Sequence, residues 1–207
     1  MINLFKSKEN IWKSFSKQSG GTFFEGEYGM LDGTIVSYKN WKIVFDYYDL
    51  YSGKFNERFT RVFVPIVSLD DFRFEIYNNG IIRSIEKFFG AQDIEIGIKE
   101  FDKRFILKSN NGFKLKKLLL NPQIRQLLEF QKEVNFEISN YKGIWEKESQ
   151  ELELSFFLKG EVKSIETLNF LLELFKLVLD NLAENHTTIP KPDSADLQSV
   201  LVPILIR

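Results

Sequence analysis

The sequence contains no cysteine and a single histidine, His186. Zinc, iron–sulfur, haem–thiolate and cysteine-nucleophile chemistry are therefore nearly excluded, because they need these residue types. An excess of one charge is missing as well: 28 Lys and Arg stand against 29 Asp and Glu, which does not favour a general nucleic-acid binder. No hydrophobic run approaches the roughly 20 residues that span a bilayer, and the first residues lack the apolar core of a signal peptide. We therefore expect a cytoplasmic protein.

Aromatic residues, by contrast, are abundant: the 207 residues include 21 Phe, 7 Tyr and 3 Trp. This composition excludes disorder over most of the length. A chain of this size can bury a core without a disulfide or a metal. We expect one domain over residues 1–184, a flexible linker with two prolines over 185–196, and an apolar tail over 197–207.

Alternation of apolar and polar residues predicts a large, mostly antiparallel sheet that begins as a five-stranded meander. The meander strands are expected at 22–28, 34–38, 41–47, 58–66 and 72–77, and further extended segments at 94–98, 101–108, 134–138, 144–145 and 152–158. Helices are expected at 9–19, 81–89, 113–120, 123–130 and 165–182. The last helix has a broad apolar face, so we expect it to pack on one face of the sheet, giving an α+β fold.

Phosphate-binding, dinucleotide-binding and nucleophile-elbow motifs are absent from the sequence, and we predict no cofactor. His186 lies in the proline-containing linker, away from the rigid element that a catalytic or metal-binding histidine needs. Asp46 and Asp49 are three residues apart on a strand and are expected on opposite faces. Glu151 and Glu153 share a polar strand face, which is usually solvated. We predict no catalytic residue and no metal ligand.

A basic stretch between residues 103 and 117 contains six cations and no acid: Lys103, Arg104, Lys108, Lys114, Lys116 and Lys117. It is either an anion patch for phosphate, an acidic partner or a membrane surface, or a solvated face balanced by acids elsewhere. RNA binding is not favoured, because Phe105 and Phe113 look like core positions rather than exposed stacking platforms.

Both ends of the sequence offer alternatives for docking. Residues 2–17 form a basic amphipathic segment with a tryptophan, which could lie on a membrane or pack on its own domain. The tail at 197–206 is too apolar to be left exposed, and we expect it to dock on its own sheet or on a neighbouring molecule. The second alternative predicts a homo-oligomer.

Several stretches together carry a resemblance over roughly residues 10–184: Trp12 followed by GGTF at 20–23, FRFEIY at 72–77, GAQDIEIG at 90–97, FDKRFILKSN at 101–110 and NPQIR at 121–125. The combination resembles a family of uncharacterised bacterial proteins of about this length. The resemblance implies a bacterial, single-domain protein and carries no activity, cofactor or catalytic residue. From the density of polar loop residues, we predict a ligand site where Gln92 and Asp93 meet Asp102 and Lys108.

The leading hypothesis for function is a non-enzymatic interaction or ligand-binding module, which predicts an apolar groove. One alternative is a hydrolase or transferase that uses carboxylates and a divalent metal, which requires three or more acids in one pocket. The other is a peripheral membrane protein, which predicts binding to anionic vesicles that is lost at high salt.

Overall fold

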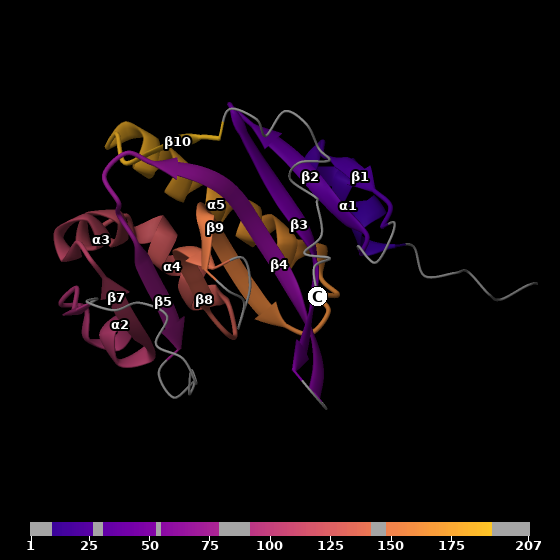
Figure 1. The fold of residues 1–207 in the computed structure, drawn as a ribbon. Helices are drawn as coiled ribbons and strands as arrows, with labels where there is room; N and C mark the ends of the chain where they lie inside the picture. Colours follow the sequence, from indigo (N-terminus) through magenta and orange to yellow (C-terminus); the bar gives the residue numbers. More distant parts are fainter. Residues whose placement is uncertain (1–9, 27–30, 53–54, 79–91, 142–147, 192–207) are drawn as a thin grey trace, which may run out of the picture.

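The computed structural model describes residues 10–26, 31–52, 55–78, 92–141 and 148–191 (Figure 1). The helix expected at 81–89, the strand at 144–145 and the tail at 197–207 lie outside these residues. Five helices are described: α1 (Ile11–Ser19), α2 (Lys99–Arg104), α3 (Gly112–Leu119), α4 (Pro122–Phe130) and α5 (Ile165–Glu184). The strands are β1 (Thr22–Phe24), β2 (Gly33–Tyr38), β3 (Trp41–Ser52), β4 (Phe55–Ser68), β5 (Phe74–Asn78), β6 (Gln92–Asp93), β7 (Phe105–Ser109), β8 (Asn135–Tyr141), β9 (Glu148–Lys159) and β10 (Thr188–Pro190).

All ten strands form one sheet, in the order β1-β2-β3-β4-β9-β8-β5-β7-β6, with β10 paired to β4. Every pairing is antiparallel, so the predicted α+β class with a large antiparallel sheet is confirmed. The meander is confirmed for β1 to β4 but is wrong for β5. The edge of β4 from Phe59 to Ile66 pairs with β9 instead, and this pairing brings the buried apolar residues of two distant segments together.

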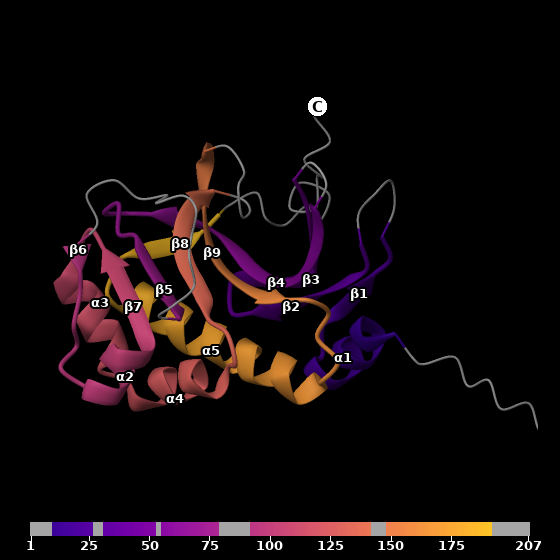
Figure 2. The same cartoon turned by 90° about the horizontal axis from the view of Figure 1, so that it is seen from below.

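The described helices lie on one side of the sheet (Figure 2). The core on this side is aromatic: the ring of Phe136 on β8 has its centroid 5.3 Å from Phe74 on β5 and 5.7 Å from Phe175 on α5. Helix α1 belongs to the same core, since Trp12 and Phe15 are buried in it. The apolar side of the N-terminal helix is thus used inside the molecule.

Side-chain caps begin the helices that the sequence predicted. Asn121 accepts a hydrogen bond from the backbone N–H of Gln123 at the start of α4, where Pro122 occupies the first turn. Ser164 accepts one from the N–H of Thr167 at the start of α5. Gly20 ends α1 with φ of 71°, a left-handed conformation that glycine adopts without strain.

Three sequence predictions of local structure are wrong. Residues 94–98, expected to be extended, belong to no strand, and Gly97 within them has a left-handed φ of 83°. Residues 101–104, expected to begin an extended segment, belong to α2 instead, because the Asp102 carboxylate accepts hydrogen bonds from the N–H groups of Ile96 and Gly97 and so closes a turn. Residues 188–190, expected in a linker, form β10, which pairs with Ile66–Ser68 of β4. A three-residue strand has too few positions for periodicity to show.

Candidate functional site

Two of the four predicted ligand-site residues are neighbours on the sheet. Asp93 on β6 is the register neighbour of Lys108 on β7, and Lys108 is in turn the neighbour of Glu75 on β5. Neighbours in register have Cβ atoms about 5 Å apart on one sheet face. Gln92 pairs with Ser109 through the backbone. Asp102 instead lies on α2, where its carboxylate holds the preceding turn.

Sequence reasoning missed a buried group of polar side chains on two central strands. Glu137 and Ser139 on β8 are the register partners of Ser155 and Glu153 on β9, and Ser139 Oγ donates to Glu137 Oε1 at 3.2 Å. Glu137 is 1% exposed and Glu153 is 5% exposed, so the expectation that Glu153 is solvated is wrong. Glu75 lies opposite Glu137 on the next strand. We call Glu75, Glu137 and Glu153 the glutamate row.

A sequence signal for the glutamate row does exist. Each glutamate stands between two apolar residues in an alternating strand: Phe-Glu-Ile at 74–76, Phe-Glu-Ile at 136–138 and Leu-Glu-Leu at 152–154. Such a pattern normally marks a solvated face. The side chains become a row because β5, β8 and β9 are neighbours, and that adjacency is not written in any one strand.

The glutamate row does not carry an argument for metal-dependent chemistry. Adjacent strands are about 4.8 Å apart, so three carboxylates on three strands spread over roughly 10 Å. Within the described part of the chain, no group of three or more His, Cys, Asp and Glu side chains is arranged to hold a metal ion.

A buried ion pair lies beside this row. Arg61 on β4 donates from Nε and Nη2 to the two carboxylate oxygens of Asp46 on β3, at 2.9 and 2.6 Å. Burial lowers the pKa of Arg61, but the charge and hydrogen bonds of Asp46, together with the charge of Glu153, raise it above its ordinary value. Arg58 pairs with Asp49 in the same ladder, on the opposite face as expected for residues three apart.

The cations of the basic stretch are distributed over α2, β7 and α3 and have different roles. Arg104 on α2 donates to the carbonyl oxygens of Glu129 and Gln131 at the end of α4. Lys103 also lies on α2, and Lys108 on β7 lies between Glu75 and Asp93 in the sheet register. Lys114, Lys116 and Lys117 are on α3. Three of the five residues of the predicted anion patch therefore lie on α3, and the patch itself stays a prediction.

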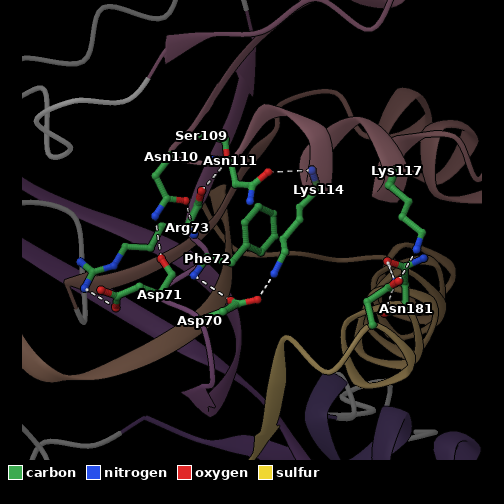
Figure 3. Close-up of polar contacts among 11 residues, drawn as sticks. Asp70, Asp71, Phe72, Arg73, Ser109, Asn110, Asn111, Lys114, Lys117 and Asn181 are labelled. Carbon is green, nitrogen blue, oxygen red and sulfur yellow. Dashed lines mark hydrogen bonds and ion pairs between the residues drawn. The ribbon is translucent and has the colours of Figure 1, made fainter.

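A polar network holds α3 against the β4–β5 connection (Figure 3). Lys114 forms an ion pair with Asp70, and its Nζ lies 5.9 Å from the centre of the Phe72 ring. Asn111 caps α3 by accepting from the N–H of Lys114 at 3.1 Å. Asn110 accepts from the N–H of Arg73 at 2.9 Å. These contacts fix the direction in which α3 leaves the sheet.

The outward side of α3 carries two exposed apolar residues and two lysines. Phe113 is 78% exposed and Leu120 is 72% exposed, so the prediction that Phe113 is a core residue is wrong. Lys116 and Lys117 lie between them and are exposed. The positions are i, i+3, i+4 and i+7, which share one helix face. We call Phe113, Lys116, Lys117 and Leu120 the α3 stripe.

Lys117 of the α3 stripe and the neighbouring Arg125 are held by uncharged acceptors. Lys117 Nζ donates to the amide oxygen of Asn185 at 2.5 Å, which orients the ammonium without cancelling its charge. Arg125 on α4 donates to the carbonyl oxygens of Leu119 and Leu120 and places a further cation at the end of the stripe. The opposite side of α3 is buried through Leu115, Leu118 and Leu119.

Comparisons with protein-family models, with curated proteins and with solved structures find no match for this chain. The resemblance to uncharacterised bacterial proteins stays a prediction. In the portion of the chain that is described, no helix combines the length and the apolar character needed to cross a membrane. The arrangement of the side chains is the basis for any proposal about function.

Proposed function

We propose that this protein is a non-enzymatic interaction module and that the α3 stripe is its docking surface. One observation carries the proposal: the two most exposed large apolar side chains of the described residues, Phe113 and Leu120, flank two lysines on a single helix face. Single exposed apolar residues are common on protein surfaces and need no explanation. Two such residues at helical spacing, with cations between them, form one continuous amphipathic surface on the same side of the helix.

The charges of the stripe indicate the character of the partner. Lys116, Lys117 and the neighbouring Arg125 attract anionic groups, while Phe113 and Leu120 favour an apolar contact. An acidic partner that also offers apolar groups satisfies both. We further propose that α5 covers one face of the sheet. Helix α3 then lies at the periphery, and its outward side is available to a partner.

The stripe is well suited to docking because its scaffold is rigid. Leu115 and Leu118 anchor the inner side of α3 in the core, and the network around Asp70 and Asn110 holds its beginning. Binding to a preorganised surface loses less conformational entropy than binding to a loop. The same proposal includes a bacterial origin, which the resemblance implies. It also includes a cytoplasmic location, with which the lack of cysteine is compatible.

The proposal is tested with a short acidic peptide built of glutamate and leucine. We expect its addition to shift the backbone amide resonances of residues 112–120 of the ¹⁵N-labelled protein, and we expect the double variant Phe113→Ser/Leu120→Ser to abolish the shifts. Leu69→Ser is the matched control, because Leu69 is an exposed apolar residue that follows the last residue of β4 and lies outside the stripe. Binding that the double variant retains in full, with both variants folded as judged by thermal unfolding, contradicts the proposal.

A further inference from the structure

We infer that the partner of the α3 stripe is an anionic lipid surface, an inference that rests on the proposed docking role of the stripe. The surface that would bind the stripe has a layer of phosphate or carboxylate headgroups over an apolar interior. The four side chains of the stripe match those two layers: the ring of Phe113 and the side chain of Leu120 enter the acyl boundary, and the lysines stay among the headgroups.

The small size of the stripe favours a lipid surface over a protein. A stable protein–protein interface buries about 800 Å² on each partner, around central aromatic and arginine anchors. The α3 helix has eight residues and is about 12 Å long, and its stripe presents two apolar side chains. A membrane needs no complementary shape, and a narrow apolar wedge beside cations is sufficient for weak, reversible binding.

The cations of the stripe are lysines, which also favours a lipid surface. Lysine is a compact charge on a flexible stem, which suits a diffuse anionic layer, whereas arginine suits the bidentate recognition of one carboxylate or phosphate. The arginine at this position, Arg125, uses its guanidinium on the carbonyl oxygens of Leu119 and Leu120. The stripe therefore carries positive charge but presents no free guanidinium for the bidentate recognition of a specific headgroup.

The geometry of the stripe sets the orientation on the lipid. Phe113 and Leu120 are seven residues apart, or roughly 10 Å along the axis at the rise of an α-helix. With Lys116 and Lys117 between them, α3 lies parallel to the surface. Helix α1, the other basic amphipathic segment, does not contribute its apolar side, because Trp12 and Phe15 are buried in the core.

Nearby acids limit the expected strength of binding. Asp70 pairs with Lys114, and Glu184 is exposed at the end of α5, next to Asn185, which binds Lys117. Binding should therefore depend on Lys116 and Lys117, each of which contributes roughly five-fold in affinity at low salt. Screening over a Debye length of about 10 Å at ~0.1 M salt makes the interaction sensitive to salt.

The experiment is co-sedimentation of the full chain with vesicles of phosphatidylcholine alone, or with about 30 mol% phosphatidylglycerol, at about 50 mM and about 300 mM salt. We expect binding to the anionic vesicles at low salt and a loss of at least about ten-fold at high salt. Lys116→Glu/Lys117→Glu and Phe113→Ser/Leu120→Ser should each weaken binding by about ten-fold or more. Lys163→Glu and Leu69→Ser are matched controls on exposed residues outside the stripe and should bind as the wild type does.

Each outcome separates the inference from the proposal on which it rests. If the glutamate–leucine peptide binds at residues 112–120 but the anionic vesicles do not bind, the lipid inference is overturned and the docking surface stands. If neither probe binds, both fail. If Lys163→Glu weakens vesicle binding as much as Lys116→Glu/Lys117→Glu does, the attraction is general charge and the inference is overturned. Loss of binding confined to the two stripe variants supports it.

Discussion

Removing Asp46 tests whether the buried ion pair beside the glutamate row stabilises the sheet. The Asp46 and Arg61 side chains are 9% and 17% exposed, and two charge-assisted hydrogen bonds join them. The guanidinium also lies over the ring of Phe63, 4.3 Å from its centroid. Asp46→Ala leaves the arginine buried with less negative charge beside it, which in other proteins destabilises by about 3–5 kcal/mol. Because Glu153 also stabilises the charged form of Arg61, we expect about 3 kcal/mol here.

The assay is a double-mutant cycle of Asp46→Ala, Arg61→Met and the double variant, followed by urea unfolding. Methionine keeps an apolar stem against Phe63 while removing the charge. We expect the double variant to be more stable than the sum of the single losses predicts, with a coupling of about 1–3 kcal/mol. Against a total stability on the order of 5–15 kcal/mol, either single variant should shift the urea midpoint clearly while leaving the m-value unchanged.

The more exposed pair on the opposite face of the same strands is the internal control. Arg58 is 38% exposed, and its hydrogen bonds to Asp49 are as short as those of the buried pair. Exposure reduces the coupling of Asp49→Ala with Arg58→Met to about 1 kcal/mol or less. Additive losses at Asp46 and Arg61, or equal coupling in the two pairs, would refute the reasoning that burial decides the strength of these contacts.

Three further changes test other parts of the structure. Burial, and then the charge of Glu161, raise the pKa of Tyr47 above its ordinary 10.0, so the stability this tyrosine contributes is complete below about pH 10 and declines as the pH rises further. Tyr47→Phe should therefore lose less stability between about pH 9 and about pH 11 than the wild type, as urea midpoints will show. Ser155 Oγ is buried and has no hydrogen-bond partner among the described residues, so Ser155→Ala should leave thermal stability unchanged or raise it by about 1 kcal/mol, and a marked loss would show that the hydroxyl has a partner. Asp102→Ala removes both hydrogen bonds to the turn before α2 and should cost about 1–3 kcal/mol, whereas the exposed Asp93→Asn should leave the melting temperature unchanged.

Signals that act within a few residues were read correctly from the sequence. The caps at Asn121 and Ser164 and the glycine stop at Gly20 involve groups no more than about a turn apart, so the local sequence is enough to place them. The alternating strands at 34–38, 41–47, 58–66, 134–138 and 152–158 were found for the same reason. Period-two patterning failed at Phe101, because an apolar residue at the right spacing is compatible with a helix or a strand.

By itself, the sequence determined the α+β class, the end of α1, the starts of α4 and α5, and the apolar faces of most strands, because these depend on side-chain type, capping groups and periodicity. The tertiary structure decided the neighbours of each strand. The pairing of β8 with β9 on one side and with β5 on the other turned glutamates from three separate strands into one buried row. It also decided that Leu115 and Leu118, rather than Phe113, are the residues through which α3 meets the core. The physical reason is that a side chain is buried only when another segment packs against it, and the periodicity within one strand or helix does not specify which distant segment that will be.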